Sequence, residues 1–165
     1  MRPEELSRQL REGSDEFLTR RRKVARLALT AAGSMGLISL YQLGIIKHLP
    51  DPPLPGFDSD KVDAAAEAYS MFSMPDGPIG LGSYAATLGL AAMGGENRAE
   101  EKPWIPLVLA AKVTFDALQA GKLTVDQVTK HRALCLWCLI AAGATFAAVP
   151  LVIPEARAAL RHIRR

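Results

Sequence analysis

An uncharged run of twenty residues, 27–46, constrains the fold of this chain more than any other feature. A helix of that length measures about 30 Å and crosses the hydrocarbon core of a bilayer. Three more apolar blocks follow, at about 79–93, 104–120 and 136–152. The second block is short and the third contains two charged residues, so neither would indicate a span by itself. In series with the other two blocks, they predict four membrane-spanning helices.

The segments between the blocks define the expected organisation. Residues 1–23 form a polar tail, 24–155 a four-span membrane domain, and 156–165 a basic tail. Prolines in the segment 47–56 prevent the first helix from continuing. Acidic and serine residues at 58–60 can cap a new helix at about 61–72, which has one apolar face. We therefore predict an all-α protein, an integral membrane four-helix bundle with a short amphipathic helix in its first outer loop.

The distribution of positive charge predicts the orientation. With four spans, both tails and the 94–103 connection lie on one side, which collects fourteen Lys and Arg residues against five on the other. By the positive-inside rule both termini are cytoplasmic. Basic residues gathered at the two ends suit an anionic lipid surface and membrane topology rather than nucleic acid, since they do not alternate with aromatic residues.

The chain has two cysteines, Cys135 and Cys138, and both stand at the head of the fourth block. Residues at i and i+3 share a helix face, so the pair can close a local disulfide or open to a dithiol. The amides of a helix N-terminus and the basic residues Lys130, His131 and Arg132 favour the thiolate that disulfide exchange requires. On the outer, oxidising side of a membrane, this pattern predicts a redox-active pair.

Other interpretations of the same stretch remain open. The two cysteines could be buried as small apolar residues without redox chemistry. They could also bind a metal with His131, which would need a fourth ligand such as His48. Trp137 is placed for an interfacial aromatic belt, and it could instead form the wall of a pocket beside the cysteines.

Charged residues inside the third block require a partner. Lys112 and Asp116 are four residues apart and therefore share a helix face. Charges at that depth are unfavourable unless they are paired and turned toward the bundle interior. We expect a structural ion pair, and a proton relay is the alternative.

Several stretches resemble the bacterial branch of the vitamin K epoxide reductase family over about residues 24–155. They are Ala-Tyr-Ser-Met-Phe at 68–72, Pro-Asp-Gly-Pro-Ile-Gly at 75–80, Ser-Tyr-Ala-Ala-Thr-Leu at 83–88, and Arg-Ala-Leu-Cys-Leu-Trp-Cys at 132–138. The resemblance implies a four-helix membrane bundle that holds a quinone, ubiquinone or menaquinone, beside the cysteines. It further implies that Cys138 faces the quinone, that Cys135 exchanges with an incoming dithiol, and that Asp76 hydrogen-bonds a quinone carbonyl.

The chain also departs from the pattern of that family. Members commonly carry two more cysteines between the first two spans, whereas residues 47–77 contain none, and Ala142 stands where some branches place a phenol. The electron donor would then be a separate thioredoxin-like periplasmic protein that reaches Cys135 directly.

The sequence therefore predicts a multi-pass enzyme of the bacterial inner membrane, with its cysteine pair on the outer face. It would pass electrons from a dithiol substrate to a membrane quinone. The alternatives are a non-catalytic membrane scaffold or redox sensor with the same fold, and a soluble helical bundle with the cysteines in its core.

Overall fold

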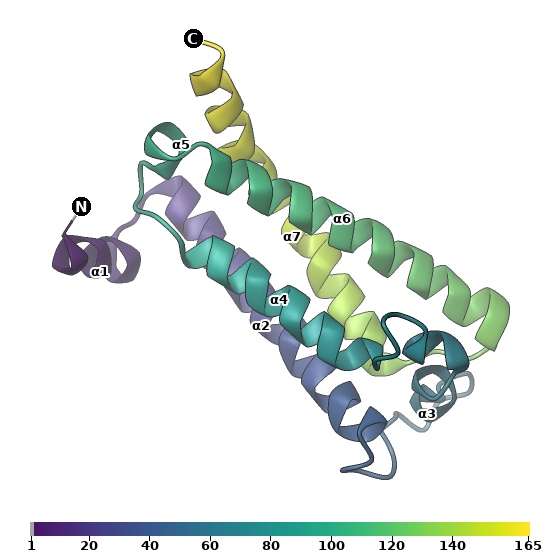
Figure 1. Cartoon of the computed structure of the whole chain (residues 1–165). Coiled ribbons are helices and arrows are strands. Elements are labelled where there is room, and N and C mark those ends of the chain that lie inside the picture. The colour runs from purple at the N-terminus through teal and green to yellow at the C-terminus, as the bar shows by residue number, and fades with distance from the viewer. Residues whose placement is uncertain (1) are drawn as a thin grey trace.

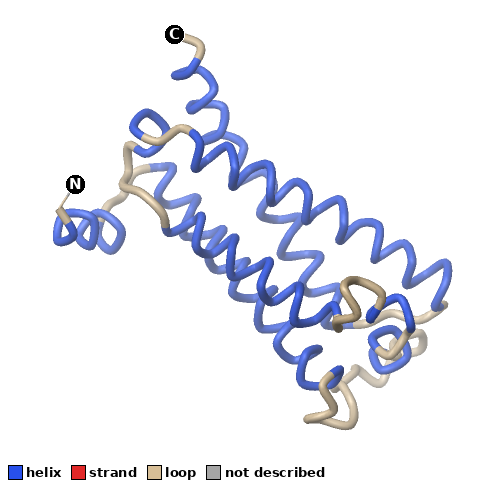
Figure 2. Tube along the Cα trace, viewed as in Figure 1, coloured by secondary structure: helices blue, strands red, loops and turns tan. Residues whose placement is uncertain are grey.

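A computed structural model describes residues 2–165, and within that range every regular element is a helix. Figure 2 shows long helices joined by loops that gather at the two ends of the molecule. The elements, in chain order, are α1 (Pro3–Glu12), α2 (Glu16–Gln42), α3 (Ser59–Asp63), the 3₁₀ helix η1 (Ala66–Tyr69), α4 (Asp76–Ala92), α5 (Arg98–Glu101), α6 (Trp104–Asp126), the π-helical turn η2 (Gln127–His131) and α7 (Leu136–Ile163). The expected all-α class is confirmed.

The four long helices lie side by side, and α2 packs against α4 and α7 while α6 packs against α7. In Figure 1, α1, α5 and both termini lie at one end, and α3 lies at the opposite end with the start of α7. The cysteine pair therefore sits at the end of the molecule remote from the termini. By length and composition, α2 and α7 are the two helices of the described chain that could cross a membrane.

Small side chains bring α2 and α7 close together. Ala28 and Ala31 of α2 are buried, as are Ala141, Ala144 and Ala148 of α7. Helices that cross a bilayer associate through such small residues, because lipid provides no hydrophobic driving force between them. This close packing fixes the first turns of α7 against α2, and with them the position of the cysteines.

A buried ion pair closes the end that carries the termini. The guanidinium of Arg98, which is 1% exposed, donates to both carboxylate oxygens of Glu155 on α7, at 2.7 and 2.8 Å. It also donates to the carbonyls of Leu90 and Met93 at the end of α4. Arg21 of α2 donates to the carbonyls of residues 93–95. These bonds connect α2, α4, α5 and α7 and satisfy carbonyls that a helix end leaves without partners.

The outer loop differs from the expected pattern. The outer-loop helix expected at about 61–72 is two shorter helices, α3 and η1, separated by extended backbone at Ala65. The carbonyls of Asp60 and Asp63 accept hydrogen bonds from Tyr41 and Gln42 of α2, which anchor the last turn of α3 to that helix. The basic tail expected at 156–165 is helical, because α7 continues through Pro154 to Ile163.

Candidate active site

Cys135 occupies the N-cap position of α7, and its sulfur takes the place of a capping oxygen. Its Sγ accepts a hydrogen bond from the backbone N–H of Cys138 at 3.1 Å. The backbone N–H of Cys135 donates to Oε1 of Gln127 at 2.9 Å, and the next N–H, of Leu136, donates to Oγ of Ser59. The sulfur therefore lies where free amides and the helix dipole favour negative charge.

The outer loop fixes the segment before α7. Leu134 pairs with the strand-like stretch around Phe57, since its N–H donates to Gly56 O at 2.8 Å and its carbonyl accepts from Asp58 N at 3.0 Å. Ser59 has no exposed surface, and its hydroxyl donates to Asp51 at 2.5 Å. The outer loop, which is distant in the sequence, thus holds the N-terminus of α7 in place.

Asp63, the last residue of α3, completes a cluster that the sequence did not reveal. Only 2% of the residue is exposed, and its Oδ1 accepts a hydrogen bond from Cys138 Sγ at 3.5 Å. Its Oδ2 has no hydrogen-bond partner among the described residues. One carboxylate oxygen of Asp63 and the two cysteine sulfurs all lie within 4.8 Å of one another.

Interactions within the cluster lower the pKa of Cys135 and raise the pKa of Asp63. The hydrogen bond with Cys138 lowers the pKa of Cys135 to about 6, despite the opposing effect of burial. Burial, assisted by the negative charge of Cys135, raises the pKa of Asp63 to about 9. At neutral pH Cys135 is therefore a thiolate and Asp63 a neutral acid, and this arrangement stores one proton beside a nucleophilic sulfur.

A cavity of about 250 Å³ begins at Cys138 and runs between α4, α6 and α7. Its apolar wall includes Met35, Ile38, Ile79, Phe115, Ala141 and Ala142, and its polar groups include Asp63, Asp76, Ser83, Tyr84, Asp116 and Gln127. Cys138 lines this cavity and Cys135 does not. Its size is close to the lower end of the range for ligand pockets, and the mixture of apolar wall and few polar groups is typical of them.

The structure places Asp76 and Trp137, the two expected quinone contacts, differently. Asp76 is the first residue of α4 and lines the cavity, and Gln42 Nε2 donates to its Oδ1 at 2.7 Å. Oε1 of Gln42 accepts from Gly77 N, an approach so close that any side chain at residue 77 would collide with it. Trp137 is not among the lining residues, and its indole N–H donates outward to Pro50 O at 2.9 Å.

The set of candidate metal ligands differs from the expected one, because it contains a carboxylate and no histidine. Among the His, Asp and Glu side chains of the described residues, only Asp63 lies close enough to share a metal ion with the two cysteines. His48 instead contacts Asp60 at 2.7 Å. Two thiols and a carboxylate are ligands that Zn²⁺ accepts, but a structural zinc site has four protein ligands. The same three groups suit a dithiol with an acid beside it.

Comparison with known proteins agrees with this geometry. A family model described as "Vitamin K epoxide reductase family" matches residues 23–153, a stretch that contains both cysteines, Asp63 and the whole cavity. None of the curated proteins with which the chain was compared matches it. Members of the family are membrane-embedded and, in general, linked to quinones and thioredoxin-like partners. The chain therefore belongs to the vitamin K epoxide reductase family of membrane oxidoreductases.

Proposed function

We propose that this chain is a thiol–disulfide oxidoreductase that spans the bacterial inner membrane with α2, α4, α6 and α7. Electrons from a dithiol protein pass through Cys135 and Cys138 to a membrane quinone. Both termini are cytoplasmic, the cysteine pair is on the outer face, and residues 24–155 form the membrane domain. The observation that carries the proposal is the asymmetry of the pair, because Cys138 lines the cavity while Cys135 is held outside it.

Electrons enter by disulfide exchange at Cys135. One donor thiolate attacks Cys135 Sγ of the oxidised pair, the bond between Cys135 and Cys138 breaks, and Cys138 leaves and takes up a proton. The second donor thiolate then attacks the donor sulfur of the mixed disulfide and releases Cys135. A thiol of low pKa is a good leaving group, and the pKa of Cys135 is lowered to about 6. The donor leaves as a disulfide, and its two protons remain at the site.

Electrons leave through Cys138, beside the cavity. The reduced site holds a thiolate at Cys135, a thiol proton on Cys138 and a carboxyl proton on Asp63, whose pKa is raised to about 9. A bound quinone accepts two electrons and two protons and becomes the quinol. Cys135 and Cys138 supply the electrons as their disulfide forms, and Cys138 and Asp63 supply the protons. The next donor dithiol restores both protons.

The cavity suits the ring of a lipid-soluble quinone. Its wall is apolar apart from a few acids and hydroxyls, and Asp76 lines it near Cys138 as a hydrogen-bonding group. The outer surface of α6 beside it exposes Phe115, Leu118 and Leu123. An isoprenoid tail can follow these side chains into the lipid while the ring occupies the cavity, so a volume of about 250 Å³ needs to hold only the ring.

The dithiol protein must displace the side chains that bury Cys135 before its thiol can react there. This sulfur has no exposed surface, and Leu49, Val62 and Ala133 pack around it. The bond from Trp137 to Pro50 holds the edge of the same loop. A thioredoxin-like periplasmic protein fits this role, because it can bind the loop and present a thiol to Cys135 at the N-terminus of α7 once the loop is displaced.

The roles of the two cysteines can be tested with single alanine variants of the full-length protein in detergent. Cys138→Ala should retain the reaction of Cys135 with an aromatic disulfide and lose oxidation of dithiothreitol by a soluble quinone. Cys135→Ala should lose both. If Cys138→Ala still oxidises dithiothreitol at the wild-type rate when quinone is added, the assignment is wrong.

A second candidate function is a redox sensor or scaffold that does not turn over. Two observations favour it, the absence of cysteines from residues 47–77 and the complete burial of Cys135. A sensor would change the state of its cysteine pair once when quinone is added. An enzyme would consume many equivalents of dithiol per chain, so counting the dithiol oxidised per protein separates the two.

A further inference from the structure

The end of the large cavity away from Cys138 carries its own polar group of residues. Ser83 of α4 and Asp116 of α6 line the cavity. Each lies about two turns or more from the end of its helix that adjoins the cysteines, which places them deep in the bundle. Lys112, one turn from Asp116, donates to Ser83 Oγ at 2.9 Å and forms an ion pair with Asp116. The side chains of Lys112 and Asp116 are 19% and 14% exposed. Charges inside a membrane-spanning helix are unfavourable and often mark a functional site.

The hydrogen bonds among Lys112, Asp116 and Ser83 leave the hydroxyl of Ser83 able to donate to a ligand in the cavity. Ser83 Oγ accepts a hydrogen bond from Lys112 and donates its own hydrogen to Asp116 Oδ1, with 3.3 Å between the two oxygens. That distance exceeds the usual O–H···O length of about 2.8 Å, so the bond is weak. The hydroxyl of Ser83 can therefore turn toward a better acceptor in the cavity, while Lys112 keeps its oxygen in place.

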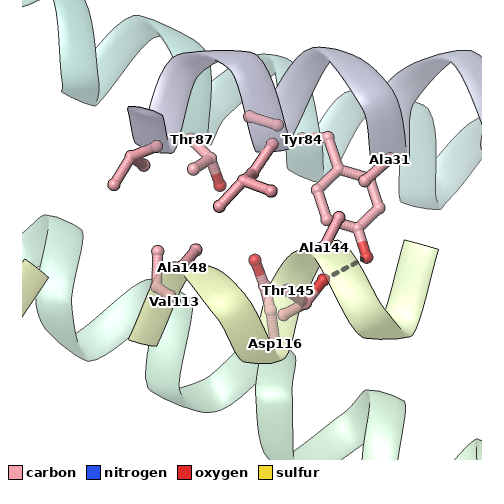
Figure 3. A pocket seen from close by; sticks show the side chains of 11 residues that line it. Ala31, Tyr84, Thr87, Val113, Asp116, Ala144, Thr145 and Ala148 are labelled. Carbon is pink, nitrogen blue, oxygen red and sulfur yellow. Dashed lines mark hydrogen bonds between the residues drawn. The ribbon is translucent and has the colours of Figure 1, made fainter. Parts of the chain in front are cut away.

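The neighbouring tyrosine has no such freedom. Thr145 uses its one hydroxyl hydrogen to donate to Ala141 O at 2.8 Å, so Tyr84 must be the donor in its 2.9 Å bond with Thr145. Figure 3 shows this bond beside Asp116, in a second cavity of only about 10 Å³. That space is about the size of one water molecule and excludes a ring. Of the two hydroxyls of α4 that line the large cavity, Ser83 is therefore the one free to donate to a ligand.

The two polar ends of the large cavity are separated by a length that suits a para-quinone. Asp76 and Ser83 are seven residues apart on α4, which corresponds to about 10 Å along the helix. A ring with carbonyl groups at opposite positions, plus a hydrogen bond of about 2.8 Å at each oxygen, has a similar length. A ligand with one carbonyl would leave the inner group without a partner.

We propose that Ser83, oriented by Lys112 and Asp116, donates a hydrogen bond to the quinone carbonyl that is remote from Cys138. The inference rests on the proposed function and assigns the residue that binds the second ring carbonyl of the quinone. Ser83 binds the ligand, and Lys112 and Asp116 are positioning residues. The positive charge of Lys112 behind Ser83 also favours the negative charge that this oxygen gains as the ring is reduced.

Ligand truncation tests this subsite. The oxidised full-length protein, which cannot reduce the ligand, is titrated by calorimetry with a soluble para-naphthoquinone and with the analogue that has one ring carbonyl. We expect the wild type to bind the quinone about three- to tenfold more tightly, the effect of one neutral hydrogen bond. Ser83→Ala should bind both ligands with the weaker affinity, and Ser83→Thr, which keeps the hydroxyl, should restore the difference.

Lys112→Met should reduce the preference for the quinone as Ser83→Ala does. Lys122→Met is its matched control, because Lys122 pairs with Asp126 at the same spacing on α6 and does not line the cavity. Infrared spectra give a second measurement, since one of the two carbonyl stretches of the bound quinone should move to higher frequency in Ser83→Ala alone. Equal affinities of Ser83→Ala and wild type for the quinone would overturn this inference and leave the proposed function intact. Failure of the wild type to bind the quinone at all would overturn both.

Discussion

Replacing Asp63 by Asn should make the protein more stable and, at the same time, slow its reaction with quinone. The carboxyl group is 2% exposed and its Oδ2 has no partner among the described residues. Burial raises its pKa from 3.8 to about 9. The amide of Asn has nearly the same shape as the carboxyl group and does not ionise. Asp63→Asn therefore removes the transferable carboxyl proton and leaves the packing nearly unchanged.

The size of the stability effect follows from that shift. The unfolded chain ionises Asp63 above pH 3.8, whereas the folded chain keeps it protonated up to about pH 9. A raised pKa in the folded state means that stability is lost as pH rises through this window. At about 1.4 kcal/mol per pH unit, the cost at pH 7 is up to about 4 kcal/mol. Asp63→Asn should avoid it and raise Tm by roughly 10 °C.

The effect on activity has the opposite sign. Loss of a positioned acid typically slows a reaction by about 10²–10⁴-fold. In the wild type, the rate of quinol formation should rise with pH as Cys135 ionises near pH 6 and fall as Asp63 ionises near pH 9. In Asp63→Asn the alkaline decrease should be absent while the acid side remains.

The assay is stopped-flow formation of quinol by the reduced protein across this pH range, with a thermal melt of each variant. Asp58→Asn is the control, because Asp58 caps α3 at the surface and Asn caps a helix equally well. A variant that is no more stable than wild type, or one that keeps the decrease near pH 9, would refute the role given to Asp63.

Three more substitutions test other parts of the structure. Arg98→Met should leave Glu155 buried with only Arg21, 3.9 Å away, as a cationic partner and cost about 3 kcal/mol, measured as a fall in Tm. Replacing Glu155 by Leu as well should recover only part of this loss, because Arg21 is then buried without a carboxylate. Trp137→Phe removes the indole N–H that holds the outer loop, so alkylation of Cys135 by a small reagent should become about two- to tenfold faster. Ala142→Leu fills part of the cavity wall and should weaken quinone binding about tenfold or more, while the exchange of Cys135 with an aromatic disulfide stays unchanged.

The sequence was informative where the signal is local. Apolar runs predicted the long helices, and the spacing of Cys135 and Cys138 predicted a pair at the start of a helix, which the structure confirms. The i, i+4 spacing of Lys112 and Asp116 predicted their ion pair. Each of these inferences needs only residues within one or two helical turns of each other.

Asp63 could not be found in this way. It lies 72 residues before Cys135, at the end of a five-residue helix that contains one other acid and is capped by another, and nothing in its neighbours marks it as buried. Only the pairing of the outer loop with the start of α7 brings it to the cysteines. Trp137 is the opposite case, a residue that the sequence placed beside the cavity and that does not line it. Adjacent residues on a helix point about 100° apart, so proximity to Cys138 in the sequence did not place Trp137 beside the same cavity.

The redox state of Cys135 and Cys138 in isolated membranes tests the central claim most directly. Membranes are reduced, freed of reductant, incubated with or without a soluble quinone, and then denatured in the presence of a thiol-alkylating reagent, because Cys135 has no exposed surface in the folded protein. We predict two alkylated thiols per chain without quinone and none after quinone is added, because the pair has closed to a disulfide. Two alkylated thiols under both conditions would contradict electron transfer to quinone and favour the scaffold.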